Sequence, residues 1–190
     1  MSSPSEVGIG LLGLGIVGGG VASVLLNSDQ PVARKSGCPV NLKKVLVRDI
    51  AKARSNSVPQ GLLTMEPLDV LDNPDVHVVV EVIGGEEPAG RYIEDAILKG
   101  KHVVTANKEV MAKHGPELIA LAGEKKVNLL FEASVGGGIP IVGPLMKHLL
   151  ANEIETIHAI INGTTNYILT RMDCEGIGFS EALKEAQDLG

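Results

Sequence analysis

A cluster of glycines lies between two apolar runs near the start of the chain. Gly13, Gly15 and Gly18 follow the apolar run 7–12 and precede a second run at 21–26. This order predicts a buried strand, a glycine turn and a helix, with the glycines on the G-x-G-x-x-G spacing. In that pattern the glycines permit a tight turn, a close backbone approach to phosphate, and close packing of helix on strand. The segment therefore favours a dinucleotide site at a helix N-terminus, with an ordinary strand-to-helix turn as the alternative.

The composition indicates a globular α/β protein. The 190 residues are 44% hydrophobic and 21% charged, which is enough for one sizeable core. Only 2% are aromatic, so the core must be aliphatic, as in a parallel sheet. A net charge of -6 without a basic block argues against nucleic acid or an anionic membrane as partner. Because the sequence shows no signal peptide or apolar span, we expect a cytoplasmic protein.

Strand-like and helix-like segments alternate through most of the chain, and their short connections predict a doubly wound, Rossmann-type parallel sheet. The expected strands are residues 7–12, 42–47, 76–83, 102–105 and 128–131. The expected helices include 88–99 and 107–125, the second of which could break at 114–116. The pattern changes from Glu132, where a glycine-dense turn runs to Pro140. After it we expect a helix at 141–150, a strand at 153–161, and short helices at 167–173 and 180–189.

Charged residues and glycines follow the predicted strands, at the edge where open α/β sheets bind ligands. Arg48 and Asp49 come after the second strand, where a carboxylate favours NAD and an arginine favours NADP. With Lys52 and Arg54 close behind, Arg48 tilts the prediction slightly toward NADP, although the two later residues could equally be a solvated charge run. The pair Gly84-Gly85 brings bare backbone to the end of the third strand.

Four segments together resemble the homoserine dehydrogenase family, and they span nearly the whole chain. They are Gly13–Gly18, Val103–Lys108, Phe131–Pro140 and Ile161–Leu169, the last three being the more specific. The resemblance implies an oxidoreductase that interconverts L-aspartate 4-semialdehyde and L-homoserine with NADP or NAD, in threonine, methionine and isoleucine biosynthesis. It also implies an NAD(P)-binding domain at residues 1–140. Residues 141–190 would then be the truncated start of an α+β domain for substrate binding, catalysis and dimerisation, so the full-length protein is expected to be a homodimer.

The resemblance also assigns site residues. Reduction of an aldehyde needs a hydride donor at the carbonyl carbon and a cation or proton donor at its oxygen. Lys108 fits the second role, because it follows a strand at the edge where open α/β sheets bind ligands. A positive charge is mildly unfavourable in the first turn of a helix, which favours a functional role over the alternative of a lysine in solvent. Asn162, Gly163 and Thr164 are expected beside the nicotinamide, although Asn-Gly is also a common turn. The expected cofactor contacts are Gly13, Gly15, Ile16, Val17, Gly18, Arg48, Gly84, Gly85, Lys108, Asn162, Gly163 and Thr164.

The glycine-dense segment after residue 131 resembles the family's loop for a monovalent cation. Carried over by position, the ligands of a structural Na⁺ or K⁺ would be Glu132, Val135, Gly137 and Ile139. Oxygen ligands suit such a hard cation. A hinge between two domains is the alternative for this glycine-rich stretch.

The family's proton-donating lysine and the acidic residue that binds the substrate's amino group belong to segments beyond the equivalent of Gly190. We therefore expect the chain to be a fragment that binds cofactor and turns over little substrate. Two other functions remain open at this point. One is a non-catalytic NAD(P)-sensing module, and the other is a different amino-acid or semialdehyde dehydrogenase of the same fold.

Overall fold

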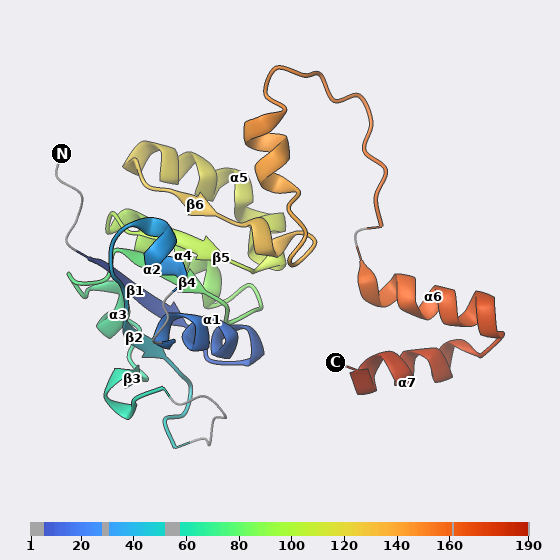
Figure 1. Cartoon of the computed structure of the whole chain (residues 1–190), viewed down its shortest axis with the longest axis horizontal. Helices are drawn as coiled ribbons and strands as arrows, with labels where there is room; N and C mark the ends of the chain where they lie inside the picture. The colour runs from blue at the N-terminus through green and yellow to red at the C-terminus, as the bar shows by residue number, and fades with distance from the viewer. Residues whose placement is uncertain (1–5, 28–30, 52–57, 161, 190) are drawn as a thin grey trace. The chain divides into compact units, whose positions relative to one another are not determined.

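A computed structural model describes residues 6–27, 31–51, 58–160 and 162–189 (Figure 1). The chain divides into two compact units, Met1–Gly137 and Gly138–Gly190. Each unit is a folded region with its own internal contacts. Among the described residues, no helix is both long enough and apolar enough to cross a membrane.

Within its described residues, the first unit contains a six-stranded sheet in the order β3-β2-β1-β4-β5-β6. Every neighbouring pair of strands is parallel. The order reverses between β1 and β4, which makes the sheet doubly wound and confirms the predicted fold class. The strands are β1 (Val7–Leu12), β2 (Val40–Leu46), β3 (Leu63–Thr64), β4 (Val78–Glu81), β5 (His102–Thr105) and β6 (Leu129–Leu130).

Helices cover both faces of this sheet, because successive residues of the strands point to opposite sides. Leu11 belongs to a core that includes Ala22 of α1 (Ile16–Leu26) and has Ala33 of α2 (Pro31–Ser36) packed against it. Leu12 belongs to the opposite core, with side chains from α3 (Leu68–Leu71), α4 (Ala89–Leu98) and α5 (Lys108–Lys125). The buried hydrophobic side chains of both cores are aliphatic, as the composition requires.

Several elements of the first unit differ from the sequence-based expectation. Helix α2 and the short strand β3 were not predicted, and β4 is shorter than the expected strand 76–83. Helix α5 runs through Pro116 without the suggested break. Proline disfavours a helix interior because it lacks an N–H group. Burial of Val110, Leu118 and Ala122 in the core beneath α4 holds this helix together across the proline.

The second unit contains a pair of helices, α6 (Gly163–Glu175) and α7 (Phe179–Leu189). Ile168 and Ala182 are buried between them. The Arg171 guanidinium donates to both carboxylate oxygens of Glu185, from Nε at 2.9 Å and from a terminal nitrogen at 3.0 Å. This bidentate pair lowers the pKa of Glu185 and raises that of Arg171.

Two expected elements of the second unit differ from the structure. The helix expected at 141–150 is present but shorter and irregular, because residues 142–143 are α-helical and η3 (Pro144–His148) is π-helical, closed by the Leu149 N–H donating to the Pro144 carbonyl at 3.0 Å. Residues 153–160 form no strand, and Ile161 lies outside the described residues. A strand needs a neighbour for its backbone N–H and C=O groups, and no described strand pairs with this segment.

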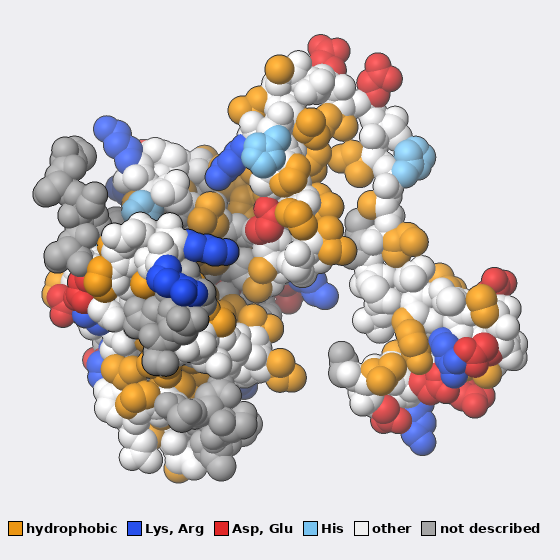
Figure 2. Space-filling view, in the orientation of Figure 1, with side chains coloured by type: hydrophobic (Ala, Val, Ile, Leu, Met, Phe, Trp, Pro, Cys, Tyr) orange, Lys and Arg blue, Asp and Glu red, His pale blue; other side chains and the backbone are white. Residues whose placement is uncertain are grey.

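Many apolar side chains between residues 138 and 160 of the second unit are exposed. Figure 2 shows hydrophobic side chains on the surface of this unit. The exposed set includes Ile139, Leu150, Ile154, Ile157 and Ile160. Helix α6 also begins four residues before the expected Tyr167, because Asn162 caps it by accepting from the Thr165 N–H at 2.9 Å.

Candidate functional site

A cleft of about 1280 Å³ lies at the carboxyl ends of β1, β2 and β4 in the first unit. Open α/β sheets bind ligands at this edge, next to the point where the strand order reverses. The cleft collects the segments that follow β1, β2, β3 and β4, together with the start of α4. Its lining includes Gly13, Gly15, Ile16, Arg48, Asp49, Val82, Ile83, Gly84, Glu87, Pro88 and Tyr92.

The glycine turn after β1 has the geometry of a phosphate site. Gly13 has a φ of +103°, which is open to glycine, and a Cβ on Gly18 would lie 2.2 Å from the Gly13 carbonyl oxygen. Gly15 differs, because a Cβ there would meet no heavy atom of the described chain within 4 Å. The open space beside Gly15 leaves room for a ligand to approach the backbone, as the second glycine of the fingerprint requires.

The N-terminus of α1 offers the donors that a pyrophosphate needs. The Gly19 N–H donates to the Gly15 carbonyl at 2.8 Å and so closes the first turn. The N–H groups of Ile16, Val17 and Gly18 precede that bond and have no partner in the helix ladder. Ile16 is 97% exposed and Val17 is 55% exposed, so this helix end is uncovered. These residues fit an anion at the helix terminus.

Arg48 and Asp49 lie side by side at the rim of the cleft, after β2. The Asp49 carboxylate accepts from the Ala51 N–H at 2.8 Å, whereas no described residue forms an ion pair or hydrogen bond with Arg48. Both side chains are exposed. A guanidinium without a partner is available to a phosphate, and an adjacent carboxylate is available to a hydroxyl. Lys52 and Arg54 lie outside the described residues.

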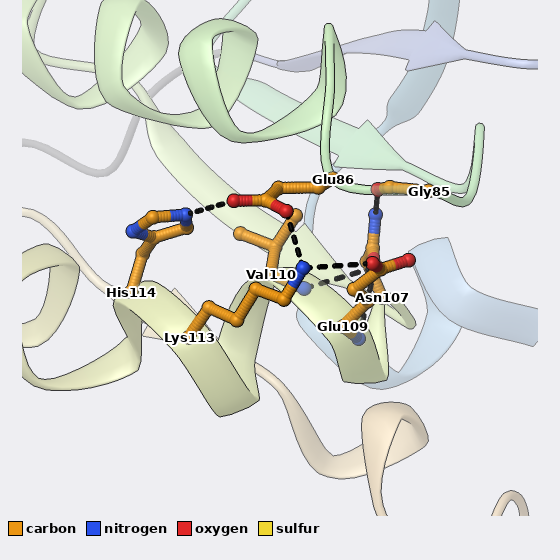
Figure 3. A network of polar contacts seen from close by, with 7 residues as sticks. All are labelled: Gly85, Glu86, Asn107, Glu109, Val110, Lys113 and His114. Atoms are coloured by element: carbon orange, nitrogen blue, oxygen red, sulfur yellow. Dashed lines mark hydrogen bonds and ion pairs between the residues drawn. The ribbon is translucent and has the colours of Figure 1, made fainter.

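The turn after β4 is fastened to α5 at several points (Figure 3). The Asn107 side-chain amide donates to the Gly85 carbonyl at 2.7 Å. The Glu86 carboxylate pairs with Lys113, and His114 Nε2 lies 2.9 Å from its other oxygen. The hydrogen bond from Lys113, and then that from His114, lowers the pKa of the Glu86 carboxyl below its ordinary value of 4.5. The cleft-lining turn is thus held against the helix that begins with Lys108.

This ion-pair cluster should make the fold sensitive to acid. Because the pKa of Glu86 is lower in the folded state than in the unfolded chain, its stabilisation is complete above pH 4.5 and is lost as the pH falls through the folded value. We expect the Glu86→Gln variant to lose less stability than the wild type between about pH 6 and pH 3. Denaturant unfolding at several pH values measures the difference. Glu87→Gln is the neighbouring control and should follow the wild-type curve, and parallel curves for all three proteins would contradict the assignment.

Lys108 is the first residue of α5 and is exposed to solvent. No described residue forms a hydrogen bond or an ion pair with its ammonium. The side chain lines a smaller cavity of about 270 Å³ in the first unit. The other walls come from α5 and from the segment after β6, including Met111, Pro116, Ile119, Phe131, Ser134 and Val135. Lys108 therefore presents an unpaired positive charge at the edge of an apolar cavity.

Three of the predicted site residues belong to the second unit. Asn162, Gly163 and Thr164 begin α6 there, and their place beside a nicotinamide stays a prediction.

The predicted cation loop falls across the division between the units. Glu132, Val135 and Gly137 belong to the first unit and Ile139 to the second. The described residues contain no group of three His, Cys, Asp or Glu side chains that could hold a metal ion. A loop that binds a cation mainly through backbone carbonyls would not need one, so the cation also stays a prediction.

Sequence reasoning assigned no role to three buried polar residues at or just after the ends of β4 and β5, although two of them lie in the segment Val103–Lys108. Glu81 and Thr105 are 0% and 1% exposed, and Asn107 is 5% exposed. Their sequence signal is a polar residue at the end of each apolar strand, with an asparagine directly before a helix. The strands β4 and β5 place Glu81 and Thr105 opposite each other.

Comparisons with known proteins agree over nearly the whole chain. Residues 13–132 match the family model described as "Homoserine dehydrogenase, NAD binding domain", and residues 140–190 match the model "Homoserine dehydrogenase". The homoserine dehydrogenase of Bacillus subtilis (strain 168) is 50% identical over 182 residues, covering 96% of this chain and 42% of that protein.

Two solved structures are similar in sequence and fold. A homoserine dehydrogenase from Thiobacillus denitrificans is 47% identical with a TM-score of 0.89, covering 97% of this chain and 43% of that chain. A hyperthermophilic archaeal homoserine dehydrogenase in complex with NADPH is 28% identical with a TM-score of 0.78, covering 97% of this chain and 61% of that chain. The chain thus spans less than half of the bacterial relatives. Its sequence, its sheet and its glycine turn place it in one group: the chain belongs to the homoserine dehydrogenase family, and its first unit is a Rossmann-type domain of the kind that the family uses to bind NAD.

Proposed function

We propose that the protein containing this chain is an NAD(P)-dependent homoserine dehydrogenase, which interconverts L-aspartate 4-semialdehyde and L-homoserine. The observation that carries the proposal is the cleft at the carboxyl edge of the sheet, whose lining includes the open glycine turn after β1 and Gly84 of the turn after β4. A domain of this fold serves many functions, so the assignment rests on the site and the family together.

The residues of the first unit fit a bound dinucleotide. The N–H groups at the start of α1 would bind the pyrophosphate, with Gly13 and Gly15 letting the backbone approach it. Arg48 and Asp49 would face the adenosine ribose, and Gly84 and Gly85 would lie toward the nicotinamide. When bound, the nicotinamide supplies or accepts the hydride of the reaction. Asn162, Gly163 and Thr164 would complete this end of the site from the second unit.

Lys108 would contact the bound cofactor and bind the substrate oxygen beside it. Reduction of the aldehyde places negative charge on this oxygen, and an ammonium group within hydrogen-bond reach stabilises that charge as it develops. The lysine is suited to this role because no described protein group neutralises it.

Arg48 leads us to propose a preference for NADP over NAD. A guanidinium binds the 2′-phosphate that only NADP carries. We expect Arg48→Ala to weaken NADPH binding to this chain about tenfold, the equivalent of one charge-assisted hydrogen bond, and to leave NADH binding nearly unchanged. Fluorescence titration with each cofactor measures both affinities.

Asp49→Asn is the matched partner of this variant. The amide keeps an acceptor for the Ala51 N–H but removes the negative charge, so NADPH should bind as well as before or better. An Arg48→Ala variant that weakens both cofactors equally, or neither, would contradict the proposed preference.

Further parts of the proposal concern the whole protein. We propose that it acts in threonine, methionine and isoleucine biosynthesis, that it is a cytoplasmic homodimer, and that Glu132, Val135, Gly137 and Ile139 bind a structural Na⁺ or K⁺. The two left-handed glycines 136 and 137, with φ values of +70° and +62°, turn the backbone sharply after Val135. Such a turn can direct several carbonyl oxygens to one point, which suits a hard cation.

A further inference from the structure

A ring of hydrogen bonds joins the ends of β4 and β5. The Glu81 carboxylate accepts from the Ile83 N–H at 2.8 Å and from the Thr105 hydroxyl at 2.6 Å. The Thr105 oxygen accepts in turn from the Asn107 N–H at 3.0 Å. The Asn107 side-chain amide then donates to the Gly85 carbonyl at 2.7 Å, two residues beyond Ile83, which closes the ring.

The Glu81–Thr105 side of the ring is buried and its partners are fixed by the sheet, whereas Gly85 is exposed. Glu81 and Thr105 are cross-strand neighbours in the parallel β4–β5 pair. Neither side chain is more than 1% exposed, so each broken bond would leave a polar group without water as a substitute. The geometry of the two strand ends is therefore set by side chains as well as by the backbone ladder.

Asn107 uses its two side-chain groups for different purposes. Its Oδ1 accepts from the N–H groups of Glu109 and Val110, each at 3.2 Å, and so caps α5. Its amide nitrogen points to the Gly85 carbonyl instead (Figure 3). A helix cap needs only the acceptor, and serine or aspartate supplies it as well as asparagine does. The amide donor is needed only for the contact with the turn.

Two site elements lie at the ends of this ring. Ile83 and Gly84 line the cofactor cleft, and Lys108 directly follows Asn107. We propose that Glu81, Thr105 and Asn107 are positioning residues that hold the Lys108 ammonium in register with the Gly84-Gly85 turn, and hence with the bound cofactor. This inference rests on the proposed function, because it concerns the separation between Lys108 and the cofactor in that site.

The test is a double-mutant cycle on cofactor affinity in this chain. The variants are Asn107→Ser, Lys108→Ala and the double variant, each titrated with NADPH by fluorescence and each unfolded thermally without cofactor. Asn107→Ser keeps a capping oxygen and loses the donor to Gly85, so its unfolding temperature should stay close to that of the wild type. Its Kd should rise roughly three- to tenfold, because Lys108 and the Gly84-Gly85 turn are then no longer held in register and a contact worth about one hydrogen bond is weakened. In the Lys108→Ala background the same substitution should change Kd less than about twofold, because the group being positioned is absent.

Thr105 supplies a second pair of variants. Thr105→Ser keeps the hydroxyl and should bind NADPH like the wild type, whereas Thr105→Val has nearly the same volume, breaks the ring and should bind more weakly. If Thr105→Ser keeps wild-type NADPH affinity and Thr105→Val does not, the effect comes from the hydroxyl hydrogen bond and not from the packing of the side chain.

The outcomes distinguish this inference from the proposed function. If the wild-type chain does not bind NADPH, the proposed function fails and the inference fails with it. If the wild type binds but Asn107→Ser binds equally well, the inference alone is wrong. It is also wrong if the serine substitution weakens binding by the same factor in both backgrounds, since the ring would then act without Lys108.

Discussion

Replacing Lys108 by methionine should lower the turnover of the whole protein about a hundredfold or more without weakening the fold. Removal of a single donor to a developing oxyanion has an effect of this size in other enzymes. Methionine is of similar length and removes only the charge and the hydrogen-bond donors. The lysine makes no ion pair with the described residues, so the fold should lose no interaction of its own.

Although Lys108→Met should lower turnover, it should not lower the stability of the fold. Lys108 is the first residue of α5, where the partial positive charge of the helix N-terminus repels an ammonium. Neutralising it should leave the free energy of unfolding unchanged or raise it by about 0.3–1 kcal/mol. A residue that slightly destabilises the fold at its position and is required for turnover is typical of a functional site.

The matched control lies on the same helix. Lys125 is in the last turn of α5, and its side chain is 37% exposed. Its Nζ lies 3.7 Å from Glu124 Oε1. A positive charge is favourable there, so Lys125→Met should cost a few tenths of a kcal/mol and leave turnover intact. Steady-state rates of homoserine oxidation by the whole protein measure the difference. Full turnover by Lys108→Met would contradict the proposed role and favour the NAD(P)-sensing alternative.

The sheet was largely predictable because its strands are apolar runs bounded by glycines and polar residues. Strand β1 has the predicted bounds 7–12, and β5 has the predicted bounds 102–105. The alternation of these runs with helical periodicity then leaves few topologies other than a doubly wound sheet. Strand β3 was missed because it has only two residues, Leu63–Thr64, which is too short for any periodic pattern.

Predictions failed where structure depends on partners distant in sequence. The segment 153–160 has strand-like composition, yet composition supplies no neighbour for its backbone, and no described strand pairs with it. Helix α5 shows the opposite failure, because local sequence suggested a break at Pro116 and packing of Leu118 and Ala122 on the core overrides it.

In the candidate site, too, the features that depend on local sequence were predicted and those that depend on distant partners were not. The glycine turn and Arg48 were visible because each depends on a local pattern after one strand. The contact between Glu81 and Thr105 joins residues 24 positions apart and depends on the register of β4 against β5. A single sequence does not reveal that register, so the ring that leads to Lys108 could not be predicted.

Gly15 should show the clearest separation between cofactor binding and stability. A Cβ on Gly15 meets no heavy atom of the described chain within 4 Å, and its backbone, with φ −81° and ψ −155°, is in the extended region. Alanine therefore fits the structure without cofactor. In the complex, the methyl group would occupy the space through which the pyrophosphate approaches the backbone. We expect Gly15→Ala to weaken NADPH binding at least tenfold, which is about 1.4 kcal/mol.

The stability of Gly15→Ala should stay near that of the wild type, because two effects oppose each other. Gly15 is the N-cap of α1, and alanine is a poorer cap than glycine. Alanine also reduces the conformational entropy of the unfolded chain, which stabilises the fold by about 0.4–1 kcal/mol. Thermal unfolding without cofactor measures the net change, and titration with NADPH measures the affinity.

Gly20 provides the matched control within the same helix. It is exposed, and a Cβ there also meets no heavy atom of the described chain within 4 Å. Because Gly20 lies inside α1, alanine should stabilise the helix by up to about 1 kcal/mol and leave NADPH binding unchanged. Equal losses of affinity in Gly15→Ala and Gly20→Ala would mean that the helix as a whole is perturbed. Wild-type affinity in Gly15→Ala would place the phosphates away from the glycine turn, since no bound pyrophosphate could then be close to this backbone.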